Sequence, residues 1–117
     1  MAIRALSLQE CDRFNSARAA VARHTDKAVE WFADDANIVL GAIAYHHFDL
    51  EWSFVVVGRD DHGQYRALDR DAGLRDLDHA RRRLVEKMAI ALVTGDQIFF
   101  TSSSRVKAKS EFGRITE

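Results

Sequence analysis

The densest group of side chains that could bind a metal ion comprises His46, His47, Asp49 and Glu51. Imidazole and carboxylate groups are suitable ligands for zinc, iron or nickel. Adjacent residues of a strand point to opposite faces, so His46 and His47 cannot easily share one ion. The sequence contains no second ligand pair with a recognised spacing. We therefore predict a polar strand end without metal or cofactor, and retain His46 and His47 as the metal candidates.

A second group that could do chemistry, by acid–base catalysis, is the run Asp60-Asp61-His62-Gly63. The same run is typical of a hairpin turn, in which the glycine supplies a positive φ. An exposed turn lacks the desolvation that shifts the pKa of a catalytic group. We therefore predict a turn here and no catalytic residue. A small metal-dependent enzyme is the third of three functional hypotheses, after the two that are developed below.

Cysteine use and hydropathy indicate the compartment. Cys11 is the single cysteine, so the chain forms no intramolecular disulfide, and its place on an apolar helical stripe predicts a buried, inert thiol. The residues after Met1 do not follow the pattern of a signal peptide, and the longest apolar stretches are far too short to span a membrane. We expect a cytoplasmic protein without membrane contact.

The charges are unevenly distributed, although the net charge of the 117 residues is only -1. Residues 30–79 contain eleven acidic and four basic residues, whereas residues 80–117 contain four acidic and eight basic ones. The acidic residues that define a candidate interaction surface are Asp34, Asp35, Asp49, Glu51, Asp60 and Asp61. They either provide solubility and protect sheet edges, or complement a basic protein partner, such as a nucleic-acid-binding protein blocked by mimicry.

A basic cluster supports the second functional hypothesis, a nucleic-acid-binding domain. Its members are Arg81, Arg82, Arg83, Lys87, Arg105, Lys107 and Lys109. The predicted order α-β-β-β-α, with basic residues early in the last helix, resembles the double-stranded-RNA-binding domain in topology over roughly residues 49–92. That family carries lysines at the start of this helix. Here the first turn carries Asp76, Asp78 and His79, and the neighbouring hairpins are acidic, so the carboxylates would repel a phosphate backbone.

Helix signals flank the middle of the chain. Ser7 and Glu10 form a capping-box pattern, which predicts a helix over residues 8–23. A short second helix, capped by Thr25 or Asp26, is predicted to bury Ala28, Val29, Trp31 and Phe32. Asp76 predicts the start of a C-terminal helix over residues 77–94, and Gly95 predicts its end.

Three strands are predicted between these helices, over residues 37–47, 51–59 and 64–69. Short connections make them an antiparallel meander in sequence order. A short fourth strand or a docking segment is predicted near residues 97–101. Residues 102–117 are expected to form a basic, poorly ordered tail.

Both faces of the first two predicted strands are apolar. On the first strand, Leu40 and Ala42 alternate with Val39, Gly41 and Ile43. Either the chain's own helices cover both faces, or a second copy or another protein covers one of them. We predict a single α+β domain over residues 1–101. As its function we predict a non-catalytic, homodimeric protein-interaction module that acts on a protein partner through its acidic hairpin surface.

Overall fold

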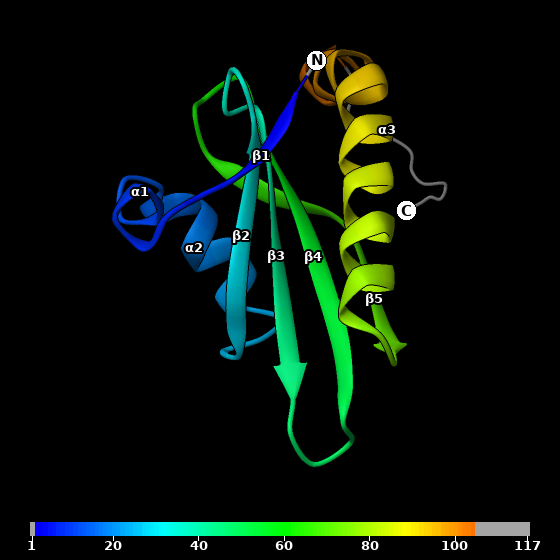
Figure 1. Cartoon of the computed structure of the whole chain (residues 1–117). Helices are drawn as coiled ribbons and strands as arrows, with labels where there is room; N and C mark the ends of the chain where they lie inside the picture. Colours follow the sequence, from blue (N-terminus) through cyan, green and yellow to red (C-terminus); the bar gives the residue numbers. More distant parts are fainter. Residues whose placement is uncertain (1, 105–117) are drawn as a thin grey trace.

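The computed structural model describes residues 2–104, with side chains to residue 94. Within this range five strands form one antiparallel sheet, and two of the three helices, α2 and α3, pack against it (Figure 1). The strands are β1 (Ile3–Ala5), β2 (Ala28–Asp34), β3 (Val39–His46), β4 (Glu51–Arg59) and β5 (Tyr65–Leu74). The helices are α1 (Leu8–Cys11), α2 (Asn15–Ala22) and α3 (Leu77–Ser104). The α+β class and the antiparallel meander are confirmed, but the prediction of three strands with a possible fourth was an undercount.

The sheet follows the sequence order, β1-β2-β3-β4-β5, and every neighbouring pair is antiparallel. The prediction for β4 was correct to the residue, and that for β3 was correct to within two residues. β5 runs to Leu74, five residues beyond the predicted end, through two register shifts against β4. The charged residues of this extension do not stop the strand because an edge strand exposes them to solvent.

The segment predicted as a second helix is the strand β2. Its apolar residues fall at positions i, i+1, i+3 and i+4 (Ala28, Val29, Trp31 and Phe32), which is also a helical spacing. A register shift against β3 lies between Ala28 and Glu30. A β-bulge of this kind adds one residue to the strand and shifts the alternation of its apolar side chains by one position. The apolar residues of β2 therefore have the spacing of a helix in the sequence.

The capping box at Ser7 is present: the Ser7 hydroxyl accepts from the Glu10 amide (3.2 Å) and the Glu10 carboxylate accepts from the Ser7 amide (2.9 Å). The predicted long first helix is instead two helices, because α1 ends at Cys11 and α2 begins at Asn15. At the other end of the chain, α3 continues through Gly95 to Ser104. A glycine destabilises a helix by only about 1 kcal/mol, and the stability of the helical turns on either side of it can outweigh this cost.

The predicted fourth strand at residues 97–101 is therefore wrong, because these residues belong to α3. The start of the predicted tail, residues 102–104, is also helical. Its remainder, residues 105–117, lies outside the described residues. No helix in the described part of the chain is long and apolar enough to cross a membrane.

Helices of the same chain cover both faces of the sheet, α3 on one side and α2 on the other (Figure 1). Against α3 lie Val39, Ile43, Phe54, Val56 and Leu74. Against α2 lie Ala33, Leu40, Ala42, Val55 and Val57. The predicted division of β3 and β4 into two apolar faces is confirmed. Of the two alternatives for covering them, the intramolecular one holds.

Candidate protein-interaction site

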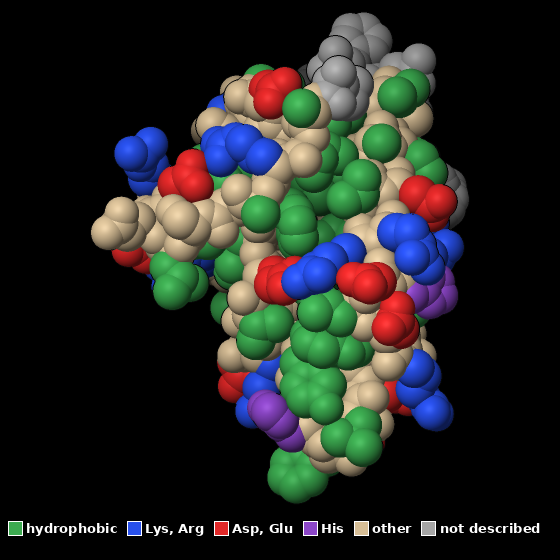
Figure 2. Space-filling model, viewed as in Figure 1, with side chains coloured by type: hydrophobic (Ala, Val, Ile, Leu, Met, Phe, Trp, Pro, Cys, Tyr) green, Lys and Arg blue, Asp and Glu red, His purple; other side chains and the backbone are tan. Residues whose placement is uncertain are grey.

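The connection between β3 and β4 projects beyond the helices at one end of the molecule (Figure 1). It consists of residues 47–50, and its two apolar side chains point into solvent: Phe48 is fully exposed and Leu50 is 66% exposed. Hydrophobic side chains are visible at this end in the space-filling view (Figure 2). We call residues 47–50 the hairpin tip. Two exposed apolar side chains at the end of a hairpin contribute little to folding.

The backbone of the hairpin tip is strained at Leu50, whose φ is +55°. The two other turns of the meander also use positive φ, but at Asn37 (+58°) and Gly63 (+81°), residues that adopt it readily. For a leucine this conformation costs about 1–2 kcal/mol. Folding alone would favour glycine or asparagine here. The exposed leucine is therefore retained at a cost to stability, and such strain is a feature of binding sites.

Aromatic side chains brace the base of the hairpin tip. The rings of Tyr45 and Trp52, cross-strand partners on β3 and β4, lie 4.5 Å apart. The ring of His47 lies against Tyr45 at 4.8 Å. These contacts on the α3 side hold the hairpin rigid where it leaves the body of the protein.

On the opposite face, the His46 Nε2 lies 2.8 Å from the Ser53 hydroxyl, which is buried. His46 and His47 therefore point to opposite faces, as predicted from the strand alternation. Among the side chains that the structure describes, no three His, Cys, Asp or Glu are grouped so that they could hold a metal ion. An ion on either face of the sheet would therefore meet only one of the two imidazoles. His46 serves instead as the hydrogen-bond partner of the buried Ser53 hydroxyl.

The six predicted acidic residues do not form one surface. Asp49 lies within the hairpin tip and Glu51 directly follows it, and Glu51 pairs with Arg75 at 3.4 Å. The other four lie at the opposite end of the sheet, because the β2–β3 and β4–β5 turns are both one strand length away (Figure 1). The hairpin tip itself carries the exposed carboxylate of Asp49 and no lysine or arginine. Its charge is therefore negative.

Two of the acidic residues at the far end shape turns. Asp34 is only 4% exposed, and its carboxylate accepts from the amides of Val39 (2.7 Å) and Ala36 (3.0 Å). Asp60 accepts from the amides of His62 and Gln64, both at 2.9 Å. The hydrogen bond from the Gln64 amide is the main reason that the pKa of the Asp60 carboxyl is lowered. Asp35 and Asp61 are the exposed members at this end.

Replacing Asp34 with alanine should lower the free energy of unfolding by about 1–3 kcal/mol, because the Val39 amide, on a fully buried residue, would lose its acceptor. Asp34→Asn keeps one acceptor oxygen and should cost less. Asp35→Ala, the exposed neighbour, should stay within about 0.5 kcal/mol of the wild type. Urea unfolding followed by circular dichroism measures all three. Equal stability of Asp34→Ala and the wild type would contradict this role.

Of the four basic residues of the nucleic-acid hypothesis that the structure describes, three are paired with the sheet. The Arg81 Nε donates to Glu30 of β2 at 2.9 Å. On the other side of α3, Arg83 pairs with Asp71 at 2.8 Å and Lys87 with Asp69 at 3.6 Å, both on β5. The Arg83 hydrogen bond is the main reason that the pKa of the Asp71 carboxyl is lowered.

Arg82 remains exposed, and Arg105, Lys107 and Lys109 lie outside the described residues. The order of elements is β-α-α-β-β-β-β-α, so the topological resemblance to the double-stranded-RNA-binding domain is not confirmed. The acidic middle and the basic C-terminal third, read from the sequence as two external surfaces, meet in part as ion pairs between α3 and the sheet.

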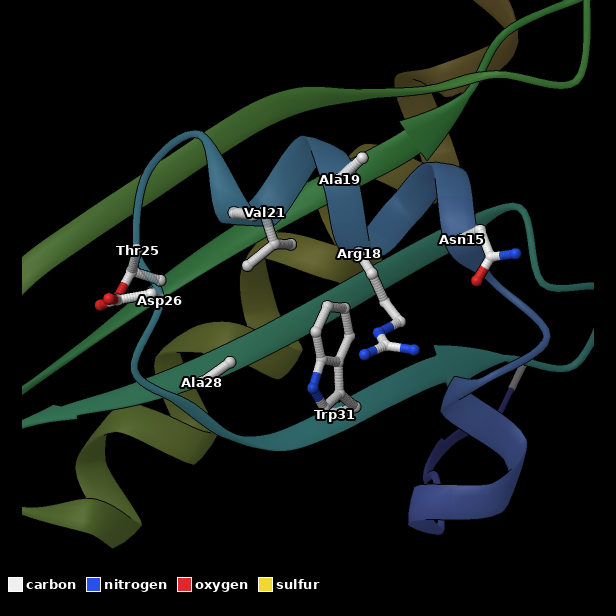
Figure 3. A pocket seen from close by; sticks show the side chains of 9 residues that line it. Asn15, Arg18, Ala19, Val21, Thr25, Asp26, Ala28 and Trp31 are labelled. Carbon is white, nitrogen blue, oxygen red and sulfur yellow. The ribbon is translucent and has the colours of Figure 1, made fainter.

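Two hollows flank β2. One, of about 530 Å³, lies between α2 and β2, with Arg18 and Trp31 among its lining residues (Figure 3). The other, of about 510 Å³, is lined by residues 5–8, residues 29–32 and Arg81. Trp31 borders both and is half-buried, although its sequence position predicted a core residue.

Cys11 is buried as predicted, and burial raises the pKa of its thiol.

Sequence reasoning missed Phe48 and Leu50, which it treated only as a tight connection. The available signal was the presence of two large apolar residues in a connection of four. Comparison with other proteins adds no further guide: no family model matches the chain, and searches of curated proteins and of solved structures find no match.

Proposed function

We propose that this chain is a non-catalytic protein-interaction module whose hairpin tip inserts Phe48 and Leu50 into an apolar pocket of a partner protein. The observation that carries the proposal is the exposed leucine at positive φ, where the fold would prefer glycine. Exposed aromatic and aliphatic side chains on a braced loop are the usual anchors of protein interfaces.

The charge of the hairpin tip indicates the chemistry of the partner. Asp49 lies between the two apolar anchors, and Glu51 follows them. A pocket with a basic rim complements this arrangement, whereas an anionic membrane surface would repel it. The proposal thus keeps a basic protein partner, as predicted from the acidic hairpin surface, but it confines the contact to the β3–β4 hairpin and makes apolar burial its main source of affinity.

A glycine substitution separates binding from folding. Leu50→Gly removes the anchor and relieves the backbone strain, so stability should stay equal or rise by about 1 kcal/mol. Partner capture should fall about tenfold or more, as expected for an interface anchor. The measurement is quantitative capture from an extract of the native host, with stability followed in parallel by urea unfolding. Phe48→Ser should lower capture to a similar degree.

Ile90→Ala is the matched control, because Ile90 is an exposed aliphatic residue on α3, away from the hairpin tip. It should leave capture unchanged. A photo-crosslinking amino acid at position 48 should label the partner, and the same residue at position 62, at the opposite end of the sheet, should not. Light scattering of the chain alone checks for a homodimer. Unchanged capture by Leu50→Gly and Phe48→Ser would refute the proposal.

A further inference from the structure

α3 covers only part of its face of the sheet. It packs on β3, β4 and β5, and it reaches β2 through the ion pair between Arg81 and Glu30. Five strands at a spacing of about 4.8 Å span about 19 Å from β1 to β5, whereas a helix with its side chains is about 10 Å across. Among the described residues, the apolar cluster on this face contains no side chain from another helix. On this face β1 and β2 therefore leave room for one further helix.

The uncovered region beside α3 is apolar and hollowed. It includes the hollow of about 510 Å³, which Phe32, Leu8 and Arg81 help to line. Ile3 of β1, Phe32 of β2 and Leu92 of α3 all pack against the core beneath α3, but each is only half-buried. Hydrophobic side chains are visible between β1 and α3 in the space-filling view (Figure 2). We call this region, the hollow together with Ile3, Phe32 and Leu92, the β2 groove.

α3 carries a second apolar surface, on the side turned away from its own sheet. Val85, Ile90 and Val93 are 38%, 56% and 72% exposed, and the half-buried Ala89 lies among them. At about 100° per residue, these four positions fall within about 140° of the helix circumference, on the side opposite the buried Leu84. The outer side of a surface helix normally carries polar residues. We call these four residues the outer stripe of α3, and their exposure indicates a contact with another molecule.

The outer stripe and the β2 groove are complementary, and they open on the same face of the molecule. A two-fold axis parallel to α3, placed between α3 and the groove, brings the stripe of each copy against the groove of the other. The two α3 helices then lie side by side in one layer between the two sheets. Rotation about such an axis keeps each residue level with its counterpart in the second copy.

A charged cluster in the β2 groove supports a second copy as the occupant. Arg81 pairs with two carboxylates, those of Glu30 and Asp78, so the cluster has a net negative charge. Arg82 is exposed, and its guanidinium makes no ion pair or hydrogen bond with the residues that the structure describes. Because counterparts are level in this arrangement, Arg82 of one copy faces the cluster of the other copy and supplies the missing positive charge.

We infer that two copies of this chain associate through α3, with the α3 helix of each copy seated in the β2 groove of the other. Arg81, Val85 and Ala89 follow one another at intervals of four residues, so Ala89 lies on the side of α3 that faces β2 and close to the two-fold axis. The hairpin tips lie outside this contact, and each copy keeps its own. The inference therefore does not depend on the function proposed above.

Sedimentation equilibrium of the full chain, over a wide range of concentrations, should show a monomer–dimer equilibrium. Val93→Arg places a charge in the outer stripe, and Arg82→Glu reverses the charge that faces the acidic cluster. Each should raise the dissociation constant about tenfold or more. Arg23→Glu is the matched control, because Arg23 is an exposed arginine at the end of α2, on the opposite face of the sheet. It should leave the dissociation constant unchanged.

Disulfide cross-linking locates the contact. Ala89→Cys should form a disulfide-linked dimer under mild oxidation, because the two copies of residue 89 meet near the axis, whereas Ala19→Cys on α2 should not. The native Cys11 is buried and does not interfere.

A monomer at every concentration would overturn the inference. So would a dimer that survives both Val93→Arg and Arg82→Glu, or one that cross-links through Ala19→Cys as readily as through Ala89→Cys. Phe48→Ser should remain dimeric. Loss of the dimer in Phe48→Ser would assign self-association to the hairpin tip, so the α3 contact would fail while the hairpin tip remained a binding site.

Discussion

Replacing Gly41 with valine is expected to lower the free energy of unfolding by about 3 kcal/mol. Gly41 lies on β3 directly beneath α3, and a Cβ at this position would be 2.6 Å from the Leu84 Cδ1 and 2.8 Å from the Met88 Sδ. Both helix residues are fully buried, so they have little room to yield. Overpacking of this kind typically costs 1–3 kcal/mol. Urea unfolding measured by circular dichroism gives the value.

A double-mutant cycle identifies the cause. In the Leu84→Ala background the cavity left by the leucine can accept the new side chain, so Gly41→Val should cost less than it does alone. Gly63→Ala provides the contrast. A Cβ at Gly63 meets no atom within 4 Å, and its cost comes from φ of +81° alone. Leu84→Ala should not change that cost. Additive losses for Gly41→Val and Leu84→Ala would rule out the steric explanation.

The parts of the fold that were predictable depend on local alternation. Both faces of β3 and β4 were assigned correctly because their residues alternate without interruption, from Val39 onward and from Glu51 to Arg59. The prediction for β2 failed because one bulge shifts the alternation of its apolar residues, and the pairing with β3 that identifies the strand is not encoded in that local pattern. β1 is three residues long and carries no periodic signal. A strand of that length is identified only by its neighbour.

The candidate site depends on features that the sequence does not carry. The run Phe48-Asp49-Leu50 marks a connection, but whether its apolar residues turn inward depends on the backbone angles, and the strain at Leu50 is visible only in φ. The uneven distribution of charge was visible in the sequence, but the pairs that the charged residues form were not. Strand pairing places Glu30 on one side of α3 and Asp71 on the other, where Arg81 and Arg83 reach them. The acidic middle of the chain and its basic C-terminal third are thus joined in part by partly exposed ion pairs between the sheet and α3.

The same substitution at two phenylalanines should give opposite results. Phe54→Ala is expected to lower the free energy of unfolding by about 4 kcal/mol, because Phe54 is 1% exposed and is the largest of the fully buried side chains that the structure describes, packed in the core beneath α3. Phe48→Ala should change stability by no more than about 0.5 kcal/mol, because the ring is fully exposed. Denaturant unfolding of both variants, monitored by circular dichroism, gives the comparison.

A folded domain is stable by about 5–15 kcal/mol, so Phe54→Ala can unfold a protein at the lower end of that range. Phe54→Leu then provides a folded variant with a smaller loss. The Phe48→Ala variant tests the proposed function as well as the packing of the hairpin tip. A residue kept for binding contributes to the affinity for the partner and not to the stability of the free chain. A loss of several kcal/mol in Phe48→Ala would show that the hairpin tip packs against the protein itself, and the anchor proposed for a partner would then belong to the fold.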